Sequence, residues 1–384
     1  TERNISLEID GNFFPGENKF YVSLDVPLDG MPFLGDVRGF FTNIDLLLPW
    51  KGAKGRINYL AEIRSAKVSP QIKGAIDFQG SVFPFPQFAH AFRDYSGLVF
   101  FEDGNFSIRS LHGKLGGGDV QGSGRFKLGK GGVEEIDVNV EGKSLLLSPL
   151  ERTMALVDGN INLFKDADRF ILDGDFFVHK LSWRREITEK FAFSSAFSNE
   201  SRREPGFFDD LTLNIRLKAD NNAWMENSLG SIRGRFDLNI TGNVKSPIIL
   251  GDIEAFGGDL YFQDREFKIL RGRVSFIDPL SLEPYLSFKG ETYVKDYRVT
   301  FSLDGLLDHL NPEFSSSPPL PPEDVLALLA LGEAFKRTYS YDRSTQLSTA
   351  SLLSFQLSEE AKKRSEGLFN IDRFRIDPFI MGSS

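Results

Sequence analysis

The stretch "LTLNIRLK" (Leu211–Lys218) carries the pattern that decides the fold. In it, apolar side chains alternate strictly with polar ones. Because successive side chains of a β-strand point to opposite faces of the sheet, this stretch predicts a strand with one apolar and one polar face. The same alternation recurs along most of the chain, with clear examples at Ile5/Leu7/Ile9, Val22/Leu24/Val26, Ile136/Val138/Val140, Phe236/Leu238/Ile240 and Tyr297/Val299/Phe301/Leu303.

Aspartate–glycine pairs, which are typical of tight turns, punctuate these strands. They stand at Asp10-Gly11, Asp29-Gly30, Asp103-Gly104, Asp158-Gly159, Asp173-Gly174 and Asp304-Gly305. The segments between strands are too short for crossover helices, which favours antiparallel pairing. We therefore predict an all-β fold: one long, curved, mostly antiparallel sheet of roughly 20 strands, whose apolar faces share one side and form a U-shaped hydrophobic groove resembling a β-taco.

A few segments have helical rather than strand character. Pro321 and Pro322, followed by two acidic residues, suit a helix start, and an apolar stripe then predicts a short helix over Asp324–Leu331. A second helix is predicted from a cap at Ser344 to Gly367. Weaker patterns predict short helices at Pro86–Tyr95, Ser148–Leu156 and Thr188–Ala196.

Three parts of the chain follow from these patterns. We expect an elongated sheet over residues 1–310, with a C-terminal module from about residue 242. A Ser/Pro-rich corner and the two C-terminal helices occupy residues 311–367, and residues 368–384 begin a terminal strand region that we expect to be truncated. Blocks of about seven strands, as in a β-sandwich, are less favoured because no clear linker precedes residue 310.

Composition and spacing argue against several functions. The net charge of −9 disfavours a nucleic-acid partner, and the absence of cysteine excludes thiolate chemistry. The four histidines are scattered without metal-ligand or triad spacing. A phosphate-loop-like ending at residues 142–144 and the glycine-rich residues 116–124 lack the flanking elements that such motifs need. We therefore expect no enzymatic activity, no cofactor and no metal.

Phenylalanine dominates the aromatic residues, with 37 Phe against 9 Tyr and 3 Trp. Phe offers a hydrocarbon surface without the polar group that Tyr and Trp carry. Two interpretations remain open from periodicity alone: the Phe-rich faces pack together as an ordinary core, or they line a hydrophobic surface that binds a partner.

Residues 242–332 carry a set of motifs in a fixed order. They comprise "GNVKSPIILG" from Gly242, "FGGDLYF" at Phe256–Phe262, "FKILRGRVSF" at Phe267–Phe276, and "FSSSPPLPPEDVLALLALG" at Phe314–Gly332. This region resembles the C-terminal module of the TamB family, the inner-membrane subunit of the translocation and assembly module. The earlier "KLGGGDVQGSGRFKL" at Lys114–Leu128 is similar to the looser AsmA-like repeats of the same family.

The resemblance implies a groove that spans the periplasm of a diderm bacterium, anchored to the inner membrane by an N-terminal segment absent from this chain. Such proteins are implicated in moving phospholipids between the inner and outer membranes and in outer-membrane protein assembly and secretion, with a TamA-like outer-membrane barrel as partner. The family motifs imply structural roles for Gly251, Gly258, Gly272, Pro284, Ser317, Pro318, Pro319 and Leu320.

The leading hypothesis is a lipid conduit whose apolar face shields phospholipid acyl chains from water. The expected lining residues are Leu213, Ile215, Phe236, Leu238, Phe262, Phe276, Phe288, Val299 and Phe301. One alternative is a chaperone that receives outer-membrane strands by β-augmentation at a sheet edge. A less favoured one is a secreted polysaccharide-binding β-solenoid, which would need clustered carboxylates or exposed aromatic platforms.

Overall fold

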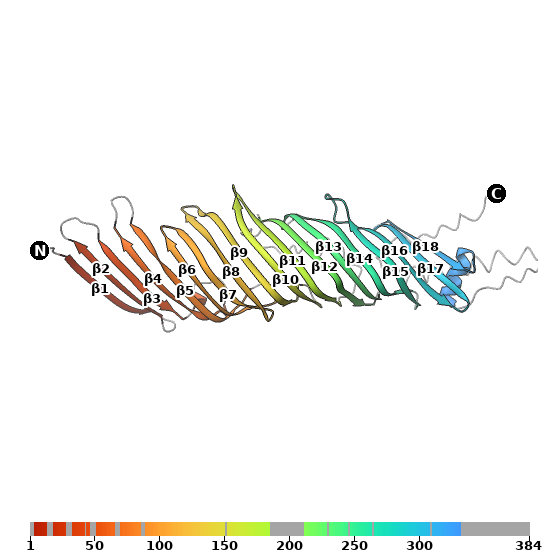
Figure 1. Ribbon diagram of the computed structural model, residues 1–384, viewed down its shortest axis with the longest axis horizontal. Helices are drawn as coiled ribbons and strands as arrows, with labels where there is room; N and C mark the ends of the chain where they lie inside the picture. The colour runs from red at the N-terminus through yellow and green to blue at the C-terminus, as the bar shows by residue number, and fades with distance from the viewer. Residues whose placement is uncertain are drawn as a thin grey trace, which may run out of the picture. The chain divides into compact units, whose positions relative to one another are not determined.

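The computed structural model describes residues 4–13, 18–27, 33–42, 44–46, 51–65, 70–85, 89–149, 152–184, 211–228, 230–244, 246–262, 265–307 and 309–331. Within them the chain is almost entirely β-structure (Figure 1). The strands are β1 (Asn4–Phe13), β2 (Asn18–Pro27), β3 (Leu34–Phe41), β4 (Lys54–Arg64), β5 (Gln71–Phe83), β6 (Phe92–Glu102), β7 (Asn105–Leu115), β8 (Gly118–Gly129), β9 (Gly132–Leu147), β10 (Thr153–Asp166), β11 (Arg169–Trp183), β12 (Leu211–Asn227), β13 (Gly230–Asn243), β14 (Ser246–Phe262), β15 (Arg265–Phe276), β16 (Tyr285–Val294), β17 (Tyr297–Leu306) and β18 (His309–Ser317). A 3-10 helix, η1 (Ile44–Leu46), and an α-helix, α2 (Pro322–Leu331), complete the elements.

The 18 strands belong to one open sheet. Neighbours in sequence pair with each other: β1 to β10 form one run of antiparallel pairs, and β13 to β18 form another. This order is that of a meander, in which each strand returns beside the one before it. The predicted all-β, antiparallel architecture is confirmed.

The chain divides into two compact units, which we describe separately. Unit 1 comprises residues 1–179 and 207–216, and unit 2 comprises residues 180–206 and 217–384. The predicted boundary at residue 310, between sheet and Ser/Pro-rich corner, stays a prediction.

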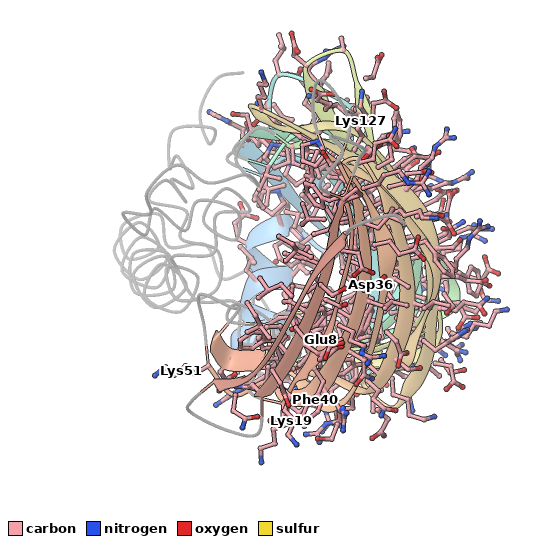
Figure 2. The ribbon with its side chains drawn as sticks, turned by 90° about the vertical axis from the view of Figure 1, so that its left-hand side faces the viewer. Glu8, Lys19, Asp36, Phe40, Lys51 and Lys127 are labelled. Carbon is pink, nitrogen blue, oxygen red and sulfur yellow. The ribbon has the colours of Figure 1, made fainter. Side chains whose placement is uncertain are left out.

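In unit 1 the pairing register sorts side chains into two faces. Ile9 pairs with Val22, which pairs with Val37, so these apolar residues share one face. Glu8 and Asp36 lie on the opposite face (Figure 2). Because strand side chains alternate, the register extends each face from strand to strand. We call the two sides the apolar face and the polar face.

In unit 2 the same sorting holds. Phe236 pairs with Ile253, which pairs with Val274, whereas Arg235 pairs with Glu254 and Arg273 on the polar face. The main core of unit 2 forms where α2 lies on the apolar face. Its buried members are Phe267, Val294, Val299, Phe301, Leu303, Val325, Leu328 and Leu329.

Helix α2 was predicted from its sequence signals and is confirmed. Pro322 is its first residue, and Glu323 and Asp324 place negative charge in its first turn, where the helix dipole favours it. The predicted second helix, Ser344 to Gly367, lies outside the described residues, as does the predicted helix at Thr188–Ala196.

Two predicted helices were wrong. Phe92–Tyr95 begin β6, and Thr153–Leu156 begin β10. Tyr95 in the first segment and Ala155 in the second are buried side chains of these strands. Short apolar runs fit either period, and pairing with neighbouring strands decides between them.

Most of the aspartate–glycine pairs were also misinterpreted as turns. Asp103-Gly104 does form the β6–β7 turn, but the glycines of four other pairs lie inside strands β1, β10, β11 and β17. Gly11 lies under the ring of Phe20, and Gly159 lies under the ring of Phe176, so that a Cβ at either position would overlap the ring. These glycines leave room for aromatic rings that lie flat on the sheet.

Candidate functional site

Most of the predicted lining residues share the apolar face of unit 2. Phe236 and Leu238 on β13 connect through the register of β14 to Phe276 on β15. Phe288 on β16 pairs with Leu303, on the face of β17 that also carries Val299 and Phe301. The structure therefore brings six of the nine predicted residues onto one surface.

The other three predicted residues are not among those six. Leu213 and Ile215 lie on the part of β12 that belongs to unit 1. They flank Asn214, whose side-chain amide donates to the carboxylate of Asp173, so they point away from that polar pair. The side chain of Phe262 lies outside the described residues.

The predicted lining residues differ in accessibility. Leu213, Ile215, Leu238 and Phe288 are half-buried, so part of each side chain is accessible to solvent. Val299 and Phe301 are 0% and 2% exposed because they pack under α2. There the Phe-rich face forms an ordinary core, which confirms the first interpretation for the surface under α2. The second interpretation, a surface that binds a partner, stays a prediction.

Aromatic rings also cover the apolar face of unit 1. The rings of Phe101, Phe106 and Phe126 form a row across β6, β7 and β8, with centroids 5.8 Å and 4.6 Å apart. Gly97 lies beneath the ring of Phe78, and Gly113 beneath that of Phe92. Glycines paired with flat rings give a hydrocarbon surface that follows the backbone closely.

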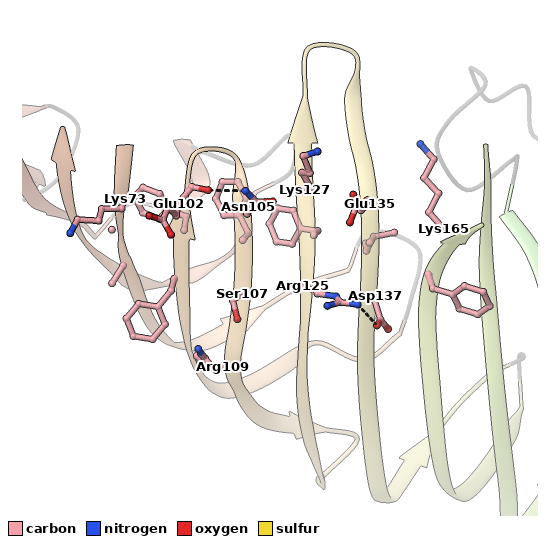
Figure 3. Close-up of a pocket in the computed structure, with 18 of the residues that line it drawn as sticks. Lys73, Glu102, Asn105, Ser107, Arg109, Arg125, Lys127, Glu135, Asp137 and Lys165 are labelled. Carbon is pink, nitrogen blue, oxygen red and sulfur yellow. Dashed lines mark hydrogen bonds and ion pairs between the residues drawn. The ribbon is translucent and has the colours of Figure 1, made fainter. Parts of the chain in front are cut away.

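Unit 1 has a hollow of about 1030 Å³ that sequence reasoning missed. Its lining, drawn in Figure 3, comes from β4 to β10 and mixes aromatic with charged residues. Arg125 reaches toward Asp137 at 3.8 Å, and Lys73 pairs with Glu62 at 2.9 Å. The lining mixes cations with carboxylates, so its positive charge is largely balanced. The residues concerned are Lys73, Arg109, Arg125, Lys127 and Lys165, and Glu62, Glu102, Glu135 and Asp137. The only sequence signal was the Phe100-Phe101 doublet, whose two rings point to opposite faces.

The polar face carries cross-strand ion pairs. The guanidinium groups of Arg235 and Arg273 both contact the carboxylate of Glu254. In unit 1, Asp158 accepts a hydrogen bond from the Ser144 backbone N–H at 2.7 Å and contacts His179 Nε2 at 2.8 Å. The Ser144 N–H, followed by His179, lowers the pKa of Asp158 below its ordinary value. These groups sit on a solvated surface, where such pairs fix register more than they add stability.

The family-motif glycines have conformational reasons to be glycine. Gly251 and Gly258 have φ of 127° and 109°, and a Cβ at either would overlap a backbone carbonyl oxygen of β13. Gly272 faces the Ala255 side chain: a Cβ added to Gly272 would lie 3.1 Å from the Cβ of Ala255. Pro284 is fully buried ahead of β16.

The Ser/Pro-rich corner links β18 to α2. The Ser317–Pro318 peptide bond is cis, and the Ser316 hydroxyl bridges the corner: it donates to the Pro318 carbonyl at 2.8 Å and accepts from the Leu320 N–H at 2.9 Å. Leu320 packs against the core under α2. Pro319 is exposed within the corner. The corner thus turns the chain from the sheet onto its apolar face.

Neither a membrane-crossing helix nor a metal centre is found in the described part of the chain. No helix there is both long and apolar enough to cross a bilayer. In the same ranges, no three His, Asp or Glu side chains gather closely enough to hold a metal ion.

Comparison with known proteins agrees with the geometry. No curated protein matches the chain. The family model described as the TamB C-terminal domain matches residues 109–379, which span β7 to α2 and extend beyond the described residues. This match covers well over half of the chain and includes every motif on which the resemblance rested. The chain belongs to the TamB family.

Proposed function

We propose that the protein is a non-enzymatic conduit for phospholipids, with acyl chains held against the apolar face of its sheet. The observation that carries the proposal is the register of β13 to β17, which aligns Phe236, Leu238, Phe276 and Phe288 on one surface. The ion pairs of Glu254 with Arg235 and Arg273 lie on the other surface. Membership of the TamB family supports the same function.

The physical basis is the burial of hydrocarbon. Removing apolar surface from water is worth about 25 cal/mol per Å², so an acyl chain strongly prefers such a face to water. Rows of Phe, Leu, Ile and Val offer neighbouring sites of similar chemistry. A chain can therefore move between them without a large change in free energy, as transport along a surface requires.

The setting that we propose follows the family. The protein would act in the periplasm of a diderm bacterium, anchored to the inner membrane, and move phospholipids toward the outer membrane with a TamA-like barrel partner. Support for outer-membrane protein assembly and secretion is part of the same proposal.

The test is site-specific photo-cross-linking at Leu238 and at its neighbour Asn239. Leu238 is half-buried on the apolar face, and Asn239 is exposed on the polar face. We expect phospholipid adducts at Leu238 and none at Asn239, in cells and with purified protein mixed with phospholipid vesicles. Adducts with unfolded outer-membrane proteins and no lipid at Leu238 would favour the β-augmentation chaperone instead.

A transport assay completes the test. Leu238→Arg places a charge on the proposed acyl path, and Asn239→Arg places the same charge on the solvated face. We expect only Leu238→Arg to block lipid passage. Normal lipid transport by folded Leu238→Arg protein would overturn the proposal.

A further inference from the structure

Helix α2 lies on the apolar face of unit 2, on the surface that the sheet would offer to acyl chains. Its residues Val325, Leu328 and Leu329 are buried against side chains of β15 and β17, among them Phe267 and Phe301. These sheet residues belong to the same registered apolar face as Phe288, which is half-buried beside them. The helix therefore occupies one end of the proposed binding surface in unit 2.

The contacts that hold α2 in place are mainly apolar. From Val325 to Leu331 the helix has no polar side chain. Within the described residues, a sheet side chain makes one polar contact with it: Arg265 Nε donates to the Leu329 carbonyl oxygen at 3.2 Å. A helix of ten residues is marginal on its own in water, so α2 depends on the sheet beneath it.

We propose that α2 is a displaceable stopper that competes with acyl chains for the apolar surface over β15 to β17. This inference rests on the proposed lipid-conduit function and adds its control: the surface under α2 is a latent extension of the conduit, closed while the helix is seated and open when the helix leaves.

Both α2 and an acyl chain present hydrocarbon to the sheet, so one can replace the other. When α2 leaves, Phe267, Val299 and Phe301 would be exposed to water unless another apolar group replaces it. An acyl chain restores that burial, so the exchange costs far less than exposure to water. Competition of this kind is reciprocal: lipid should loosen α2, and loosening α2 should admit lipid.

The first experiment compares photo-cross-linking at Phe301 and Leu238 in the full chain. The probe is p-azidophenylalanine, whose shape is close to that of the phenylalanine at 301, and the lipid is supplied as vesicles of phosphatidylethanolamine and phosphatidylglycerol. With α2 intact, we expect lipid adducts at Leu238 and at least tenfold fewer at Phe301. Leu328→Asp should unseat the helix by burying a charge in its interface and raise the yield at Phe301 to that at Leu238. Glu323→Asp, on the exposed first turn of α2, is the matched control and should change neither yield.

The outcomes test the stopper and the lipid conduit separately. Lipid at Leu238 but none at Phe301 in folded Leu328→Asp protein overturns the stopper and leaves the conduit standing. Equal yields at both positions in the unmodified chain also overturn the stopper. Absence of lipid from both positions in every variant overturns the conduit and the stopper together.

A second experiment buries no charge under α2, in case Leu328→Asp fails to fold. The chain has no cysteine, so a single Leu328→Cys thiol reports only on the helix interface. Leu328 is fully buried and Glu323 is exposed, so we expect Leu328→Cys to react with a maleimide at least tenfold more slowly than Glu323→Cys. Adding the same vesicles should accelerate labelling of Leu328→Cys severalfold and leave Glu323→Cys unchanged. An unchanged rate at Leu328→Cys, while lipid cross-links at Leu238, would overturn the inference.

Discussion

Two stretches of apolar face carry the same alternating pattern and have opposite exposure. On β1 of unit 1, Ile5 and Leu7 are 55% and 48% exposed. On β15 and β17 of unit 2, Phe267 and Val299 are both fully buried. The difference is the presence of α2, which covers the second stretch. Alternation thus identifies which face of a strand is apolar, and a separate element decides whether that face is a core or an accessible surface.

The largest expected effect is a difference in stability between variants of the covered stretch and of the open stretch. Phe301→Ala removes a ring from the covered stretch and should lower the free energy of unfolding by about 3–5 kcal/mol, the range for large-to-small changes in a core. Ile9→Ala on the open stretch should cost less than about 1 kcal/mol, because the side chain is already partly in water. Urea denaturation followed by circular dichroism measures both. Equal losses would mean that the two stretches are buried alike in solution.

A smaller loss of stability is expected where a glycine of unit 2 is required by its backbone conformation. Gly258→Ala should destabilise by about 2 kcal/mol, because φ is positive and the new Cβ would meet the Ser231 carbonyl oxygen. Its neighbour Gly257 has open space around it, with Arg233 Nη2 at 3.7 Å as the nearest atom, so Gly257→Ala should be close to neutral. Thermal unfolding of the two variants provides the comparison. Similar melting temperatures would show that the local backbone adapts.

The polar contact of α2 with the sheet tests how firmly the cover is held. Arg265→Ala removes the donor to the Leu329 carbonyl and should cost about 1 kcal/mol, the usual net value of one hydrogen bond. The loss should appear as faster amide hydrogen exchange in α2. Arg271→Ala, at an exposed position of the same strand, is the control. Identical exchange rates in α2 in both variants would mean that apolar contacts alone seat the helix.

The smallest expected effect concerns the polar face of unit 1, where neither cover nor core is involved. The pKa of Asp158 is lowered in the folded protein, chiefly by the Ser144 N–H and then by His179. Its stabilising contribution is therefore present above the ordinary aspartate pKa of about 4 and is lost as pH falls through the lowered value. Asp158→Asn should reduce stability by less than about 1 kcal/mol at pH 7, because the side chain is substantially solvated. Unfolding midpoints of both proteins should converge as pH falls below about 4, and a constant difference would contradict the assignment.

Sequence reasoning succeeded where the signal is local. The period-2 pattern at Phe236/Leu238 and at Val299/Phe301 identified the face that the register later aligned. The proline and acidic residues at the start of α2 predicted that helix. Each of these features depends on neighbours within one strand or one turn.

Sequence reasoning failed where a residue's role depends on a neighbouring strand. Gly11 and Gly159 looked like turn residues, but each is a strand glycine that makes room for the ring of Phe20 or Phe176. Nothing near either glycine in the sequence indicates that ring, because the register that places it is set by pairing. The hollow in unit 1 is assembled from seven strands, and its one sequence signal, the Phe100-Phe101 doublet, does not indicate which strands lie beside it.

The sequence by itself therefore determined that this protein is a sheet with one apolar and one polar side, because alternation imposes two faces on any strand. Only the tertiary structure decided which part of the apolar side is open and which is closed. Phe301 is buried because Leu328, from a helix beyond the corner at Ser317-Pro318, returns to cover it. Burial is a property of contacts between distant segments, and the pattern within a strand does not contain it.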